Sequence, residues 1–156
     1  MTKINGSNAQ WLDESTLPPL ITAAEQLAVD EALLNEAEFG NLTTPIVRTW
    51  QAAVPAVVLG SSSQLRQEVN HEICAKLDIP VLRRPSGGAT VILGPGCVMW
   101  SVITPFKDKP SLDAIHASML EPLAAELSKV GQPVVREGTS DCLLYTSDAA
   151  DERLRV

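Results

Sequence analysis

The sequence lacks several features that would mark a specialised class of protein. No apolar run approaches the roughly 20 residues of a membrane-spanning helix. The N-terminus has neither the apolar core of a signal peptide nor the arginine-rich character of a transit peptide. Positive charge is also scarce: the formal net charge is −7, which argues against sequence-independent binding to nucleic acid or anionic membrane, because both need basic surfaces. We therefore expect a cytoplasmic protein with no nucleic-acid or membrane partner.

Cysteine is scarce as well. The three cysteines, Cys74, Cys97 and Cys142, are far apart and odd in number, which fits neither a disulfide framework nor a CxxC metal site. The rest of the composition is ordinary, because 45% of the 156 residues are hydrophobic and 20% are charged. This balance is typical of a globular domain that is long enough to bury a core.

Periodicity predicts an α+β fold. Apolar residues at helical spacing predict helices from near Leu20 to Gly40, over Glu68–Leu77 and over Leu112–Val130. Runs of β-branched residues predict strands over 46–50, 56–59, 80–82, 89–93, 97–104 and 133–136. The turn at 94–96 is too short for a parallel crossover, so we expect the strands on either side of it to pair antiparallel. Helices would then pack on a mixed, largely antiparallel sheet, after a loose leader over residues 1–16.

The densest chemical signal is the segment RRPSGGATV, from Arg83 to Val91. Gly87 and Gly88 follow a predicted strand, where a flexible backbone can approach a ligand closely and turn its amides toward an anion. The two arginines add bidentate donors for carboxylate or phosphate. From spacing alone, an ordinary β-turn with surface arginines is an equally good interpretation.

This segment resembles the RRxSGGGAV signature of the biotin/lipoate protein ligase family. Three more segments follow in the family's order and spacing: residues 24–34 resemble its NLAxDEALL helix, 57–60 its strand–glycine loop and 138–141 its NGxSD element. The resemblance covers about Leu20 to Asp141. It implies a partial catalytic domain over residues 17–141, with the incomplete fold of biotin–lipoate ligases and class II aminoacyl-tRNA synthetases.

The resemblance also implies an activity. A lipoate–protein ligase-like enzyme would activate lipoate or octanoate with ATP to an acyl-adenylate and transfer the acyl group to a lysine of a lipoyl-carrier domain. Its partners would be the lipoyl domains of 2-oxoacid dehydrogenases or the glycine cleavage H protein. We expect a monomer that uses ATP, Mg²⁺ and lipoate without a permanently bound cofactor.

The same resemblance assigns roles to residues. Arg84 and the backbone of 88–92 would line the pocket for the acyl carboxylate and the nucleotide phosphate, while Asp141 would hold Mg²⁺ or the adenylate. Asp30 and Glu31 would brace loops behind the pocket, because an acid on an apolar helical face needs buried donors. The full set of binding candidates is Gly60, Arg83, Ser86, Gly87, Gly88, Ala89, Thr90, Val91 and Ile92.

Several departures from the family pattern leave alternatives open. Ala89 replaces the third glycine of the signature, and Leu93-Gly94 replaces the usual His-Asp. Related octanoyltransferases form a thioester on a cysteine, so Cys97 is a candidate nucleophile for ATP-independent transfer, although we favour a small buried hydrophobe on a strand. A domain that binds an acyl or nucleotide ligand without turnover is the third alternative.

The family pattern stops after Asp141. The RKxSG element of ligases is not found, and no lysine follows Lys129. Residues 142–152 resemble the in-frame translation of a transposase-type sequencing adapter, so we expect residues 142–156 to be a non-native tail on a truncated domain that is inactive alone. The alternative is a genuine strand over 143–145 followed by a short charged tail.

Overall fold

A computed structural model of the chain describes residues 3–4, 7–13, 22–106, 110–131, 133–137 and 141–144, with the backbone alone at 3, 4, 7, 137 and 141–144. The chain divides into two compact units. We call Ala9–Pro105 the site unit, and Met1–Asn8 with Phe106–Val156 the terminal unit. No helix in the described ranges is both long and apolar enough to cross a membrane.

The first helix of the site unit, α1 (Ala23–Glu38), has strong signals at both ends. At its start, the Thr22 hydroxyl accepts from the Glu25 amide at 3.2 Å, and the Glu25 carboxylate accepts from the Thr22 amide at 2.8 Å. This capping box satisfies backbone donors that the helix cannot satisfy itself. Gly40, with φ of +78°, follows its end. The helix predicted between Leu20 and Gly40 is confirmed.

The site unit also contains two three-stranded sheets among its described residues. The first has the order β3 (Gln10–Trp11), β4 (Ile46–Gln51), β8 (Val98–Ile103), and the second has the order β6 (Val81–Arg83), β5 (Ala56–Leu59), β7 (Val91–Leu93). β3 and β6 lie parallel to their neighbours, whereas the β4–β8 and β5–β7 pairs are antiparallel. The mixed, largely antiparallel arrangement is confirmed, but β3 falls in the segment that we expected to be a loose leader.

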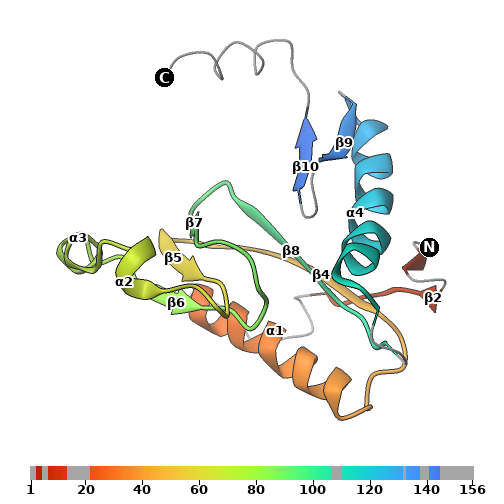
Figure 1. Cartoon of the computed structure of the whole chain (residues 1–156), viewed down its shortest axis with the longest axis horizontal. Helices are drawn as coiled ribbons and strands as arrows, with labels where there is room; N and C mark the ends of the chain where they lie inside the picture. The colour runs from red at the N-terminus through yellow and green to blue at the C-terminus, as the bar shows by residue number, and fades with distance from the viewer. Residues whose placement is uncertain are drawn as a thin grey trace. The chain divides into compact units, whose positions relative to one another are not determined.

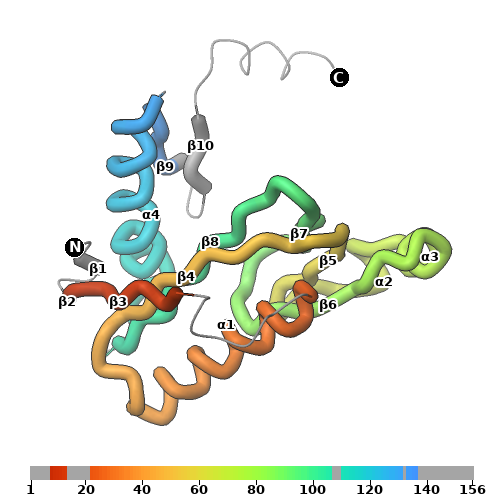
Figure 2. Tube along the Cα trace, turned by 180° about the vertical axis from the view of Figure 1, so that it is seen from behind, coloured from red at the N-terminus to blue at the C-terminus, as the bar shows by residue number. Residues whose placement is uncertain are grey.

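The two antiparallel pairs share one register. Gln51 pairs with Val98 in the first and Ala56 with Leu93 in the second, so four residues intervene on each strand. The pairs therefore form one interrupted ribbon, visible where β4 runs on into β5 and β7 into β8 (Figure 2). The expected pairing of 89–93 with 97–104 is wrong, since β7 and β8 follow each other along one side of this ribbon. Each interruption contains a proline, which lacks the N–H that would continue the ladder.

One hydrophobic core joins α1 to both sheets. Figure 1 shows α1 lying along the strands of the site unit. The buried members of this core are Ala23, Leu27, Trp50, Ala52, Ala56 and Val58, with Leu82, Leu93 and Met99 packed against them. Because β4, β5 and α1 share these side chains, the core fixes the end of β5, where the glycine loop begins.

The helix predicted over Glu68–Leu77 is divided in two. α2 (Leu65–Glu68) and α3 (His71–Lys76) are separated by an extended Val69, with φ of −131°. Asn70 caps α3, because its side chain accepts from the Ile73 amide at 3.1 Å. The cap starts a new helix and rotates the expected apolar stripe outward. Ile73 is consequently half exposed, and Cys74 is the buried residue of α3.

The terminal unit contains α4 (Leu112–Ser128) and two short antiparallel pairs. These are β1 (Lys3–Ile4) with β2 (Ser7–Asn8), and β9 (Val134–Glu137) with β10 (Asp141–Leu144). The Ser128 hydroxyl joins α4 to β9, accepting from the Val134 amide at 2.9 Å. β10 crosses the boundary that we expected after Asp141, and residues 145–156 of the expected tail lie outside the described residues.

Candidate functional site

The glycine loop and the signature segment are packed backbone to backbone. We call residues 60–64 the Gly60 loop and residues 84–90 the signature loop. A Cβ on Gly60 would lie 2.0 Å from the Gly88 carbonyl oxygen, which is closer than any side chain permits. The Ser61 amide donates to the Ser86 carbonyl at 2.9 Å, and the Arg84 amide donates to the Leu59 carbonyl at 2.9 Å. The structure thus brings together backbone groups that lie 25 to 28 positions apart in the sequence.

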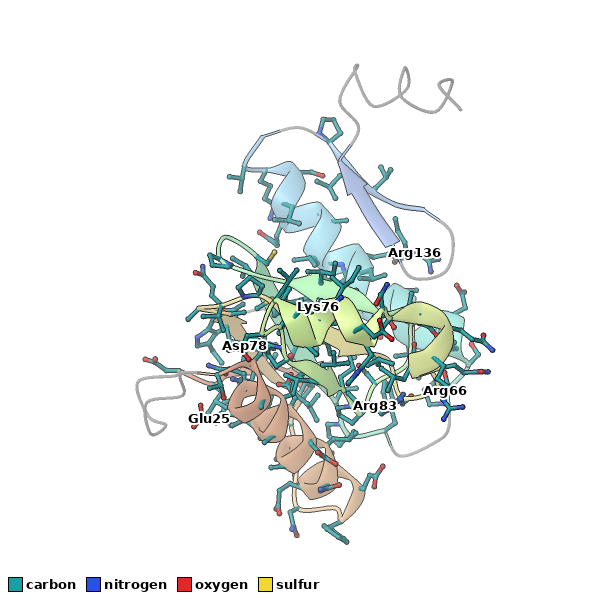
Figure 3. The ribbon with its side chains drawn as sticks, turned by 90° about the vertical axis from the view of Figure 1, so that its left-hand side faces the viewer. Glu25, Arg66, Lys76, Asp78, Arg83 and Arg136 are labelled. Carbon is teal, nitrogen blue, oxygen red and sulfur yellow. The ribbon has the colours of Figure 1, made fainter. Side chains whose placement is uncertain are left out.

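Arg83 holds the Gly60 loop from the end of β6. Its Nη1 donates to three carbonyl oxygens of that loop, Gly60 at 2.6 Å, Ser63 at 2.9 Å and Ser61 at 3.1 Å. Figure 3 labels Arg83 on the side of the site unit that carries α2. The positive charge of the guanidinium therefore stabilises three carbonyl groups that point toward it from the same loop. This contact differs from the carboxylate or phosphate contact expected from the sequence.

Arg84 plays a similar part within the signature loop. Its Nη2 donates to the carbonyls of Gly87 at 2.7 Å and Ala89 at 3.0 Å, its Nε to Gly87 at 3.2 Å and its Nη1 to Val58 at 3.3 Å. Burial of the guanidinium lowers the pKa of Arg84 from its ordinary value. Arg84 therefore folds the signature loop around itself.

This arrangement turns amides away from the arginine. All peptide bonds of the described residues are trans, so a carbonyl that points at Arg84 directs the N–H of the next residue the opposite way. That applies to the amide of Gly88, whose φ of +94° lies in the left-handed region. In the ranges that the structure covers, the amides of Gly87, Gly88 and Ala89 donate to no protein acceptor. We call these three residues the amide cradle, because successive unpaired backbone donors next to a left-handed glycine can bind an anion.

Glu68 is a site residue that the sequence did not reveal. Its Oε2 accepts from the Thr90 hydroxyl at 2.5 Å, and its Oε1 accepts from the Gln64 amide at 2.9 Å. The Thr90 hydroxyl, the Gln64 amide and the Ser63 hydroxyl lower the pKa of Glu68 to about 2. Only the spacing of four between Gln64 and Glu68 hints at this contact, and many surface glutamates share it.

The remaining binding candidates surround the cradle. Ser86 is exposed and half-buried Thr90 donates its hydroxyl to Glu68. Val91 and Ile92 lie on β7, where 42% of Val91 and 75% of Ile92 are exposed. Both are therefore accessible beside the cradle, as a binding role requires.

Cys97 differs from the favoured interpretation. It is exposed and lies in the interruption before β8, so the expectation of a small buried hydrophobe on a strand is wrong. Its amide donates to the Gly94 carbonyl at 3.0 Å, which holds the thiol-bearing residue in a turn. The β5–β7 register puts Val91 opposite Val58 and Leu93 opposite Ala56. Cys97 therefore follows the end of β7 that lies farther from the cradle.

Asp30 braces the sheet from α1. Its Oδ1 pairs with Arg48 of β4 at 2.7 Å, and its Oδ2 accepts from the Ser101 hydroxyl of β8 at 2.8 Å. Arg48 is fully buried and also donates to the carbonyl and the side-chain oxygen of Gln26. Asp30 therefore contacts two strands of the sheet, where we expected it to brace loops. Glu31, for which we expected the same role, is exposed. The sequence analysis missed Arg48, although an arginine inside an apolar strand run is a visible signal.

The proposed metal ligand lies in the other unit. Asp141 begins β10, but its side chain and residues 138–140 are outside what the structure describes. In the described part of the chain, no group of three His, Cys, Asp or Glu residues gathers as a metal site. Of the two histidines, His71 is exposed on α3 of the site unit, and His116 lies on α4 of the terminal unit.

Comparisons with known proteins find relatives in sequence and in fold. An octanoyltransferase LipM of Carboxydothermus hydrogenoformans is 39% identical over 71 residues, which are 46% of this chain and 26% of the relative. A bi-partite lipoate protein ligase from Thermoplasma acidophilum, studied with its E2 lipoyl domain, superposes with a TM-score of 0.64 at 21% identity, over 79% of this chain and 48% of that one.

A lipoate-protein ligase A bound with ATP superposes equally well, with a TM-score of 0.64 at 25% identity, over 74% of this chain and 45% of that one. The chain thus spans about a quarter of the curated relative's length and about half of each solved structure. The family model for the lipoyl protein ligase A/B catalytic domain matches residues 22–147. The chain therefore belongs to the lipoyl protein ligase A/B catalytic domain family.

Proposed function

We propose that this chain carries the anion-binding part of a site for lipoyl or octanoyl transfer to protein. The amide cradle is the observation that carries the proposal, since Arg84 binds the Gly87 carbonyl and the Gly88 amide, on the other side of that peptide bond, is left to meet a ligand. The acyl carboxylate and the phosphate of a nucleotide are both anions that suit such donors. Val91, the first residue of β7, is 42% exposed and provides apolar surface close along the chain for an acyl chain.

In the reaction, a carboxylate oxygen of lipoate or octanoate attacks the α-phosphorus of ATP, which gives the acyl-adenylate and releases pyrophosphate. The amine of a carrier lysine then attacks the acyl carbon, loses a proton and displaces AMP. The cradle binds the charged oxygens and holds them in place, so its contribution is orientation and charge stabilisation. No described cluster fits a metal ion, and we assign no step to Mg²⁺.

The partners follow from the chemistry of transfer. The acceptor is a lysine on a lipoyl-carrier domain, such as that of a 2-oxoacid dehydrogenase or the glycine cleavage H protein. The name of one solved structure supports this choice, because that ligase was studied with its own E2 lipoyl domain. We also propose that the enzyme is a monomer and acts in the cytoplasm.

Titration calorimetry with a non-hydrolysable lipoyl-adenylate analogue tests the proposal on this chain. Arg84→Ala should weaken binding at least tenfold, because the signature loop loses the contacts that orient its amides. Arg66→Ala, on the exposed surface of α2 (Figure 3), is the matched control and should bind as the unchanged chain does. Equal affinity of the Arg84 variant would contradict the site assignment. Pyrophosphate release by the full-length parent protein tests the ATP-dependent step.

A second candidate is ATP-independent octanoyl transfer through a thioester on Cys97. The name of the LipM relative and the exposure of Cys97 favour it, whereas the position of Cys97 beyond the far end of β7 disfavours it. Incubation with an octanoyl thioester donor separates the two mechanisms by mass spectrometry. An octanoyl adduct that disappears in Cys97→Ser supports the second mechanism. Analogue binding without pyrophosphate release or adduct formation would indicate a non-catalytic binding domain.

A further inference from the structure

A single carboxylate joins the two loops of the site at the end opposite to the glycine contact. Glu68, the last residue of α2, accepts from Gln64 in the Gly60 loop and from the hydroxyl of Thr90 in the signature loop. The Thr90 contact is 2.5 Å long, the length of a strong hydrogen bond to an ionised acceptor. The low pKa of Glu68 keeps that acceptor charged at neutral pH.

Thr90 is a position where this chain departs from the signature that it resembles. The pattern RRxSGGGAV has alanine at this position, whereas the chain reads RRPSGGATV. Alanine has no hydroxyl, so a chain with alanine at this position would lack the side-chain donor that joins the signature loop to Glu68. The contact is therefore a feature of this sequence.

The position of the contact indicates what it does. Gly60 packs against Gly88 at one end of the cradle, and Arg84 holds the carbonyls of Gly87 and Ala89 from inside. Thr90 follows Ala89 directly, so its bond to Glu68 fixes the other end. We propose that Glu68, acting through Thr90, is a positioning residue that orders the amide cradle and thereby strengthens its binding of the acyl-linked carboxylate or phosphate, an inference that rests on the proposed function.

The negative charge of Glu68 indicates that the residue helps binding by ordering the signature loop and not by attracting the ligand. A carboxylate next to an anion site repels the ligand, and its direct electrostatic effect on binding is therefore unfavourable. Its benefit comes from reducing the freedom that the loop loses on binding, since a preorganised site loses less conformational entropy. Removing the Thr90 hydroxyl is for this reason a cleaner test than removing the charge.

The experiment compares Thr90→Val, which keeps the shape without the hydroxyl, with Thr90→Ser, which keeps the hydroxyl. Calorimetry uses two probes, the non-hydrolysable lipoyl-adenylate analogue and neutral lipoamide, which lacks the anionic group. Thr90→Val should raise the Kd of the analogue about three- to tenfold, the range expected for one hydrogen bond. It should leave the Kd of lipoamide unchanged, and Thr90→Ser should behave as the unchanged chain.

Amide ¹⁵N relaxation at Gly87, Gly88 and Ala89 gives a second readout that needs no ligand. The order parameters of these amides should fall in Thr90→Val and stay near the rigid value of about 0.85 in Thr90→Ser. Glu68→Gln, which keeps a weaker acceptor, should lie between the two. Unchanged order parameters together with an unchanged Kd in Thr90→Val would overturn the inference.

The two proposals fail in different ways. If the unchanged chain binds neither probe, the proposed function is wrong, and the relaxation data alone decide whether Glu68 orders the cradle. If the unchanged chain binds the analogue and Thr90→Val binds it equally well, the proposed function stands and the positioning role is refuted. A loss of lipoamide binding in Thr90→Val would also refute it, because the effect would then be general to the fold.

Discussion

Gly60 and Gly88 meet backbone to backbone, with the Gly88 carbonyl oxygen 2.0 Å from the place where a Gly60 Cβ would lie. Gly60→Ala should therefore push the two loops apart and destabilise the chain by about 1–3 kcal/mol, the usual effect of overpacking. Urea unfolding followed by far-ultraviolet circular dichroism measures the free energy of unfolding, and calorimetry should show weaker analogue binding.

Gly87→Ala is the matched control for that substitution. A Cβ on Gly87 would have no atom within 4 Å, and the residue does not require a positive φ. Its free energy of unfolding should stay within about 0.5 kcal/mol of the unchanged chain. Equal stability of the Gly60 and Gly87 variants would mean that the two loops are not in contact in solution.

A second prediction concerns Arg83, whose Nη1 meets three carbonyls of the Gly60 loop. Arg83→Ala should leave those carbonyls without their cation and lower the free energy of unfolding by about 1–2 kcal/mol, because charge-assisted bonds at a partly exposed site are worth that much. Arg66→Ala removes an exposed arginine of neighbouring α2 and should be near neutral. A larger effect at Arg66 than at Arg83 would contradict the structural role.

The sequence predicts the elements of the site unit better than their pairing. Hydrophobic periodicity and the glycine stop locate α1, and β-branched runs locate β4 and β5 within a residue or two. Periodicity describes one segment at a time, however, and cannot say that Gln51 pairs with Val98. The turn at 94–96 consequently predicted a hairpin of β7 with β8, whereas in the structure β7 pairs with β5 and β8 pairs with β4.

The candidate site shows the same limit. The glycines and arginines of the signature identify the right loop, because their chemistry is local. What each arginine contacts depends on carbonyls from other segments, such as Val58 for Arg84 and Ser63 for Arg83. Glu68 was missed for this reason, since its partner Thr90 lies 22 residues away.

Lowering the pH should protonate Glu68 and weaken its contact with Thr90. Its pKa is about 2 in the folded chain against an ordinary value of 4.5, chiefly because it accepts from the Thr90 hydroxyl. A depressed carboxyl pKa contributes stability that is present above about pH 4.5 and is lost as the pH falls toward 2. Carboxyl ¹³C NMR should give a Glu68 pKa near 2, and Thr90→Val should raise it toward the ordinary value. An ordinary pKa in the unchanged chain would show that the contact does not form.

Thiol labelling should distinguish two of the cysteines. Cys97 is exposed in its turn, whereas Cys74 is 8% exposed on α3. Iodoacetamide at neutral pH should therefore modify Cys97 well before Cys74, because only an accessible thiolate reacts. Peptide mass spectrometry over a time course measures both rates, and denaturant should equalise them. Faster labelling of Cys74 in the native chain would contradict the burial of this side chain within the site unit.

The buried pair of Asp30 and Arg48 should dominate the stability of the sheet. Arg48 is fully buried and its partner is 16% exposed, so Asp30→Ala would remove a charged partner of a buried guanidinium, at a cost of about 3 kcal/mol. Glu31→Ala, the exposed neighbour on α1, is the control and should change the free energy of unfolding by less than about 0.5 kcal/mol. Replacing both partners, as Asp30→Leu with Arg48→Met, removes the buried positive charge together with Asp30. Urea unfolding should therefore find the double variant more stable than Asp30→Ala, and additive losses would show that the two residues do not pair.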